Sequence, residues 1–167
     1  VDAVNFKVNG GQGSDGQVLT STGSGVGWED ASGGGIAYKE EGANFTGSLI
    51  VGHDTTGTLS SADGNTAVGL DCLKAITSGD HNVFMGFECG DAITTGGQNI
   101  GIGVRNLKAM QTGSNNTCVG YGNIRYATAN TATQNASLGY NALSGTSFDA
   151  SYNTALGSQA GVNISTG

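Results

Sequence analysis

The stretch NIGIG at residues 99–103 is one of six copies of the same phrase, in which Asn is followed by two variable residues, an apolar residue and Gly. The asparagines are Asn65, Asn82, Asn99, Asn116, Asn135 and Asn153, and the closing glycines are Gly69, Gly86, Gly103, Gly120, Gly139 and Gly157. Successive asparagines lie 17, 17, 17, 19 and 18 residues apart. One period upstream, SLIVG fits the phrase with Ser48 in place of Asn, so residues 48–167 hold seven units. A fixed period of this kind indicates a repeat architecture.

The length of the unit selects among repeat architectures. Helical repeats need about 33 residues or more per unit, whereas two short strands and two turns fit a unit of about 17. Stacked units of this kind form parallel sheet with a rise of about 4.8 Å per unit. We therefore expect an all-β fold, a parallel β-roll or β-solenoid of 17–19-residue repeats. The repeated Gly is expected at a bend, and the repeated Asn in a hydrogen-bonded ladder of side chains along the stack.

The chain divides into three segments. Residues 1–35 are irregular, with a short N-terminal module that ends in the glycine-rich joint SGGGI. Residues 36–47 are expected to cap the repeats, and the acidic pair Glu40 and Glu41 is interpreted as a solvated edge that blocks end-to-end stacking. Residues 48–167 form the repeat β-roll.

Composition excludes two classes of partner. Only 11% of the 167 residues are charged and the net charge is −7. The six Lys and Arg residues are not clustered, which argues against nucleic acid, because binding to phosphates depends on basic side chains. The sequence has no run of about 18 apolar residues, so no membrane insertion is predicted.

One face of the predicted strands needs a covering partner. The apolar residue of each phrase and the residue two positions later point to the same side of a strand. These later residues are Leu70, Phe87, Val104, Tyr121 and Tyr140. A coil of 17 residues has a thin interior, and an apolar face of this kind is usually covered by another subunit. We therefore expect a homotrimer, in which three chains surround an axis.

The three cysteines do not form a disulfide framework. Cys72 and Cys89 lie one repeat apart, so they would be neighbours in the stack at a distance that permits a disulfide. Two buried free thiols are the favoured interpretation, and a bond between them is the alternative. Cys118 has no partner in either case.

The residues that could carry chemistry are few, and no cofactor or metal is predicted. His53 and His81 lack a third ligand at a related spacing and are interpreted as surface histidines. GGQGSDGQV at residues 10–18 resembles a calcium-binding nonapeptide but occurs once, so it is interpreted as a glycine-rich turn. Asp71 and Glu88 share a repeat position and are the only carboxylate pair that a glycan hydrolase could use. We expect no catalytic residues and no enzymatic activity.

Two groups of residues carry a family resemblance. The runs NTAVGLDCL, NTCVGYGNI, SLGYNALSG and NTALGSQAG, within residues 48–167, resemble the head repeats of trimeric autotransporter adhesins, whose heads are left-handed parallel β-rolls. Similar repeats of longer period recur in bacteriophage tail-fibre proteins. The segment GSDGQVLTSTGSGVGWED at residues 13–30 resembles a short module common in phage fibre and other virion proteins. The repeat length of 17–19 favours the phage fibre.

The resemblance implies a structural role in host attachment. We expect a trimeric segment of a virion fibre of the tail-fibre type, located in the virion, that contacts other virion proteins and a host surface receptor or glycan. The alternatives are a capsid decoration fibre, an adhesin head on a bacterial cell surface, and a glycan depolymerase. Receptor contacts are expected where the repeats lengthen, at residues 126–134 and 145–152, because loops on one side of a solenoid usually bind. The aromatic candidates there are Tyr126, Phe148 and Tyr152.

Overall fold

A computed structural model describes residues 17–21, 26–30, 38–40, 42–127, 131–145 and 149–164. The chain forms two compact units, Val1–Ile36 and Ala37–Gly167. In the first unit, β1 (Gln17–Ser21) pairs antiparallel with β2 (Val26–Asp30), and Leu19 lies opposite Trp28. Most of the calcium-like nonapeptide, and Glu41 in the second unit, lie outside the described residues.

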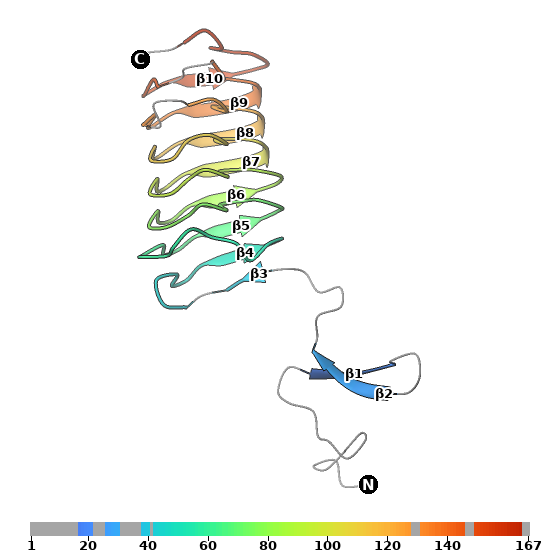
Figure 1. The fold of residues 1–167 in the computed structure, drawn as a ribbon. Coiled ribbons are helices and arrows are strands. Elements are labelled where there is room, and N and C mark those ends of the chain that lie inside the picture. Colours follow the sequence, from blue (N-terminus) through green and yellow to red (C-terminus); the bar gives the residue numbers. More distant parts are fainter. Residues whose placement is uncertain are drawn as a thin grey trace. The chain divides into compact units, whose positions relative to one another are not determined.

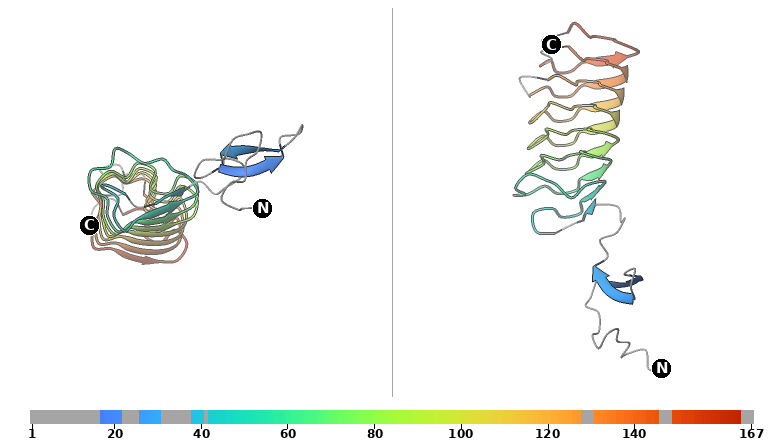
Figure 2. Two further views of the ribbon diagram at one scale, coloured as in Figure 1. Left: turned by 90° about the horizontal axis from the view of Figure 1, so that it is seen from below. Right: turned by 45° about the vertical axis from the view of Figure 1, so that its right-hand side comes forward.

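The second unit is a β-solenoid built on one sheet of eight strands (Figure 1). The strands are β3 (Tyr38–Lys39), β4 (Leu49–Val51), β5 (Thr66–Val68), β6 (Val83–Met85), β7 (Ile100–Val104), β8 (Thr117–Tyr121), β9 (Ala136–Tyr140) and β10 (Thr154–Leu156). From β4 to β10 every neighbouring pair is parallel, and Thr66 lies opposite Val83 as the repeat predicts. Seen along the stack, the coils lie on one another with all their strands on one side (Figure 2). The described residues contain no helix, so the all-β solenoid prediction is confirmed.

The glycine of each phrase makes the bend that ends the strand. Gly103 has a φ of 124°, a region that only glycine adopts without strain. A Cβ there would also meet the carbonyl oxygen of Gly120 in the next coil. Six other phrase glycines share the positive φ: Gly52, Gly69, Gly86, Gly120, Gly139 and Gly157. The expected bend is confirmed, and both of its causes, the positive φ and the close approach of backbone, apply.

Each described coil has one strand, and the prediction of two strands per unit is wrong. The second half of the coil consists of turns. Leu107 and Ile124 lie at its first corner with φ values of 55° and 48°, and both side chains are fully buried. A left-handed backbone conformation ends a strand, and for a β-branched residue such as Ile124 it is also strained. Burial of the side chains therefore stabilises this corner.

The asparagines form the predicted ladder in the buried interior. The Asn99 side-chain amide donates to Asn82 Oδ1 at 3.1 Å, and the Asn116 amide donates to Asn99 Oδ1 at 3.1 Å. The backbone N–H of Asn116 donates to the same Oδ1 at 3.0 Å. At the first coil the Ser48 hydroxyl replaces the amide oxygen and accepts from the backbone N–H of Asn65 at 2.8 Å. The ladder satisfies buried polar groups that would otherwise destabilise a thin core.

Side-chain volume in the core is balanced between coils. The third residue of each phrase points inward, and in the coil of β6 this residue is Phe84, which is fully buried. A Cβ on Gly101, one coil further on, would lie 2.5 Å from the Phe84 ring, and one on Gly90 would lie 2.8 Å from it. Gly90 departs from the leucine or isoleucine found at its repeat position because the Phe84 ring fills that space.

The first coil begins with a strand of opposite direction. β3 pairs antiparallel with β4, placing Tyr38 opposite Val51. Phe45 is buried beneath this end, and the Lys39 ammonium lies 5.7 Å from its ring centroid. The exposed edge of β4 is therefore occupied within the chain, which removes one site for uncontrolled strand pairing.

Candidate interaction surface

The outer face of the sheet exposes an apolar stripe that runs the length of the solenoid. Alternate residues of each strand point outward, and many of them are large and apolar although they are exposed. The exposed members are Leu49, Val68, Leu70, Val83, Met85, Phe87, Ile100, Ile102, Leu138, Tyr140 and Leu156. We call this set the sheet face. Its predicted members two positions after the apolar residue of the phrase are confirmed as outward-facing at Leu70, Phe87 and Tyr140, whereas Val104 and Tyr121 are half-buried.

The edge of the sheet face that follows the bend is reinforced by aromatic contacts. The rings of Tyr121 and Tyr140 stack with centroids 5.2 Å apart and planes 16° apart. The Arg105 guanidinium lies 5.6 Å from the Phe87 ring centroid. Toward β10 the face is hollowed into a shallow groove of about 310 Å³ between the strands. A contiguous exposed apolar surface of this extent is characteristic of an interaction site.

The predicted receptor residues lie at separate positions on the coil. Tyr126 is 43% exposed and follows β8, with the Arg125 guanidinium 4.9 Å from its ring centroid. Tyr152 is 79% exposed and directly precedes the asparagine ladder at Asn153. Phe148 lies outside the described residues. The hollow beside Tyr126 does not include Tyr152 among its lining residues.

The two lengthened turns are bonded to each other. The Thr131 hydroxyl donates to Asp149 Oδ1 at 2.6 Å. The backbone N–H of Thr133 donates to the Ser151 hydroxyl at 3.1 Å. The described parts of the two turns, residues 131–134 and 149–152, therefore lie against each other in neighbouring coils.

The predicted carboxylate pair is engaged in ion pairs. Asp71 lies 3.3 Å from Lys74 Nζ, while Glu88 Oε2 accepts from Lys108 Nζ at 2.7 Å and from Arg105 Nε at 2.6 Å. Hydrogen bonds from Lys108 and Arg105 lower the pKa of the Glu88 carboxyl. A general acid in glycoside hydrolysis needs a raised pKa, so this environment opposes that role.

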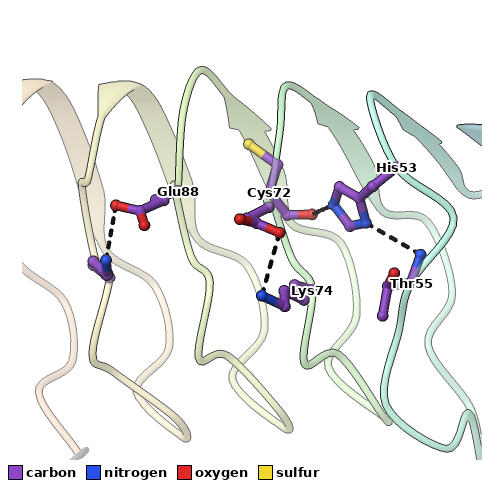
Figure 3. A network of polar contacts seen from close by, with 7 residues as sticks. His53, Thr55, Cys72, Lys74 and Glu88 are labelled. Carbon is purple, nitrogen blue, oxygen red and sulfur yellow. Dashed lines mark hydrogen bonds and ion pairs between the residues drawn. The ribbon is translucent and has the colours of Figure 1, made fainter. Parts of the chain in front are cut away.

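His53 is buried and structural, and its interpretation as a surface histidine is wrong. It is 7% exposed, and its Nε2 donates to the Cys72 carbonyl at 2.7 Å while Nδ1 accepts from the Thr55 N–H at 3.2 Å. Figure 3 shows His53, Cys72 and Glu88 on successive coils. The ring binds the backbone of the next coil, a contact that sequence spacing does not reveal. His81 is exposed, as expected.

The cysteines are free and buried, which confirms the favoured interpretation over the disulfide. Cys72 Sγ donates to the Gly86 carbonyl at 2.8 Å, and Cys89 Sγ donates to the Gly103 carbonyl at 3.1 Å. Burial raises the pKa of the Cys118 thiol to about 12. Cys118 is therefore protonated and enclosed, and a thiol in that state is unreactive.

A second column of asparagines went unrecognised in the sequence. Asn106 takes the repeat position of Cys72 and Cys89, and its amide donates to the Ile102 and Gly120 carbonyls at 2.8 and 3.1 Å. Its Oδ1 accepts from the backbone N–H of Asn123 at 2.9 Å. The spacing of 17 residues from Cys72 through Cys89 and Asn106 to Asn123 was the available signal.

Comparison with protein-family models, curated proteins and solved structures gave no match to this chain. The resemblance to virion fibres therefore depends on the quoted repeats and the segment at residues 13–30. Within the described ranges, no group of three or more His, Cys, Asp or Glu residues is placed to hold a metal ion. The same part of the chain includes no helix that is long and apolar enough to cross a bilayer.

Proposed function

We propose that this chain is a structural segment of a virion fibre of the tail-fibre type, in which three copies associate through the sheet face and present their turns to the host surface. The observation that carries the proposal is the exposed apolar stripe along a solenoid held together by buried ladders. The virion location comes from the resemblance of the repeats and of residues 13–30 to fibre proteins.

The solenoid has the properties of a stiff spacer. Strand pairing joins the coils from β4 to β10, and the Asn99-type ladder joins those from Asn65 to Asn153. The Asn106 column adds bonds from Asn106 to Asn123 and from Asn123 to the backbone N–H of Ala142. Because each repeat is held by its neighbours, the stack is stiff along its length without a large globular core. Such an element suits a fibre that holds a binding surface away from a particle.

The sheet face suits association between identical chains. Apolar residues recur at the same outward strand positions from coil to coil, exposed in most coils and half-buried at Val119 and Tyr121 of β8. Copies arranged around a rotation axis therefore place like coils at the same level. The strands are three to five residues long, which makes the face narrow. Three narrow faces around one axis can cover one another, as the resemblance to trimeric adhesin heads implies.

A charge placed on the sheet face tests the association. Ile102→Lys puts an ammonium group at the centre of the stripe and is expected to reduce the sedimentation coefficient from that of a trimer to that of smaller species. Thr95→Lys, at an exposed position in the turn half of the coil, is the matched control and leaves the assembly intact. Equal sedimentation of both variants and the parent chain would remove the sheet face from the proposal.

The attachment role is tested on cells. Labelled protein is expected to bind a subset of bacterial strains in a panel, and shortening both lengthened turns to the 17-residue period reduces that binding. If the shortened protein binds as well as the parent, the turns are not the attachment surface. A reducing-sugar assay on surface polysaccharide, with Asp71→Asn as the variant, tests the alternative of a depolymerase.

A further inference from the structure

A hollow of about 280 Å³ opens on the turn half of the solenoid, away from the strands. Three successive coils form it, each with two adjacent residues at the same repeat positions: Asp91 and Ala92, Lys108 and Ala109, Arg125 and Tyr126. None of these residues belongs to a strand, so the hollow is distinct from the sheet face. The methyl groups of Ala92 and Ala109 leave the space, and Tyr126 replaces alanine in the third coil.

Arg125 offers a donor that the described part of the chain leaves without an acceptor. Its Nε is buried and has no hydrogen-bond partner in the described part of the chain. The guanidinium lies 4.9 Å from the Tyr126 ring centroid, which fixes both groups on one side of the hollow. A buried donor without an acceptor costs about 1–3 kcal/mol, so a turn of the Arg125 side chain that brings Nε to an acceptor on a ligand would be favoured.

The remaining charges around the hollow indicate which net charge a ligand would carry. The Lys108 ammonium is bonded to Glu88 Oε2 at 2.7 Å, so these two charges neutralise each other. Asp91 has no ion-pair partner within 4.0 Å among the described residues, and its partial burial raises the pKa of its carboxyl group. Asp91 and Arg125 then contribute one charge of each sign. The lining is balanced, and the net charge of −7 on the chain disfavours a polyanion.

We propose that Asp91, Arg125 and Tyr126 bind one neutral pyranose unit of a glycan. The C–H face of the sugar ring packs on the Tyr126 ring and on the methyl groups of Ala92 and Ala109. The Asp91 carboxylate accepts hydrogen bonds from ring hydroxyls, and the Arg125 guanidinium donates to a hydroxyl oxygen. A few placed polar groups on an apolar floor are the usual construction of a small-ligand site. The site names a ligand for the proposed attachment function and in that sense rests on it.

The experiment uses the full chain and a panel of neutral methyl pyranosides: those of glucose, galactose, mannose and N-acetylglucosamine. Saturation-transfer NMR measures binding of each sugar at millimolar concentration. At least one glycoside is expected to receive saturation from the parent protein. Ala109→Leu fills the floor of the hollow and abolishes the transfer, while Tyr126→Ala and Asp91→Asn each weaken the affinity about tenfold.

Tyr38→Ala is the control, because it removes an exposed tyrosine that lies outside the hollow, outside the sheet face and outside the lengthened turns, and it leaves binding unchanged. The absence of transfer to every glycoside from the parent protein would overturn the proposal, and so would transfer that Ala109→Leu and Tyr126→Ala leave intact. The two proposals fail in different ways. If these variants do not affect cell binding, the sugar site has no part in attachment, and the attachment role of the chain stands. If the protein binds sugar but binds no cells, the attachment role alone is rejected.

Discussion

Asn99 illustrates how one residue type supports the whole stack. Its Oδ1 accepts from both the backbone and the side-chain amide of Asn116, and its own amide donates to Asn82 Oδ1 and to the Gly113 carbonyl. All of these groups are buried, so water cannot replace a lost partner. The repeated Asn is therefore a structural requirement of the coil.

Asn99→Ala is expected to lower the free energy of unfolding by about 3 kcal/mol, because it leaves buried backbone groups of two coils unpaired. Denaturant unfolding at fixed protein concentration measures the change. Gln111→Ala removes an amide side chain from the surface and serves as the control, with an expected change within about 0.5 kcal/mol. Equal values for the two variants would show that the ladder contributes no stability.

Gly103→Ala tests the bend. The added Cβ meets the Gly120 carbonyl and the residue must hold a φ of 124°, so we expect a clear fall in the thermal midpoint, corresponding to about 3 kcal/mol or more. Gly42→Ala is the matched control, since a Cβ there meets nothing within 4 Å. An unchanged midpoint for Gly103→Ala would show that this glycine is not a required bend.

At the level of the element, charged side chains connect successive coils along one edge of the solenoid. Glu88 binds Arg105 of the next coil and Lys108 in the same coil as Arg105. The folded-state pKa of Glu88 lies below its ordinary value of 4.5. Its contribution to stability is therefore fully present above that pH and is lost as the pH falls through the lowered folded-state value.

Glu88→Gln is expected to flatten the acid side of the stability profile. Below the ordinary carboxyl pKa of 4.5 the parent chain loses stability on acidification more steeply than the variant, as measured by denaturant unfolding at each pH. Glu40→Gln changes an exposed carboxylate that forms none of the ion pairs in the described residues, and should leave the profile unchanged. Parallel profiles for Glu88→Gln and the parent would contradict the account of this edge.

The strand, the bend and the ladder of the coil could be predicted from the sequence, whereas the structure of the turn half could not. The phrase around Asn99 combines a recurring spacing of 17–19 residues, a closing glycine and inward and outward residues in alternation, and each is a direct signal of backbone geometry. In the turn half, residues such as Leu107 and Ile124 adopt a left-handed backbone conformation. The intrinsic preferences of leucine and isoleucine disfavour this conformation, and burial of their side chains in the stack compensates for it. The bond from the buried His53 ring to the Cys72 carbonyl likewise depends on contacts between coils, which spacing does not show.

At the scale of the whole molecule, the period could identify a solenoid but not the position of every surface. The outward residues of the sheet face follow from strand alternation and were predictable. The hollow beside Tyr126 was not, because it requires Asp91, Lys108 and Arg125 from three coils to align with two alanines. The candidate tyrosine was recognised only from its place in a lengthened turn.

The sheet face is the surface on which the account of the assembled protein depends. The solenoid buries its polar ladders but leaves one apolar face exposed, and an apolar face of this kind is normally packed against another layer. A copy of the same chain can provide that layer. Covering it removes large side chains such as Met85, Ile102 and Leu156 from water, and burial of each contributes roughly 1–3 kcal/mol.

The most direct test of this claim is the native mass of the unaltered chain in solution, measured by multi-angle light scattering. The account predicts a single species of three times the chain mass of 16.6 kDa. A monodisperse particle of one chain mass would contradict it, because the sheet face would then remain exposed to water. A stable dimer would show that copies cover the face but would contradict the threefold arrangement.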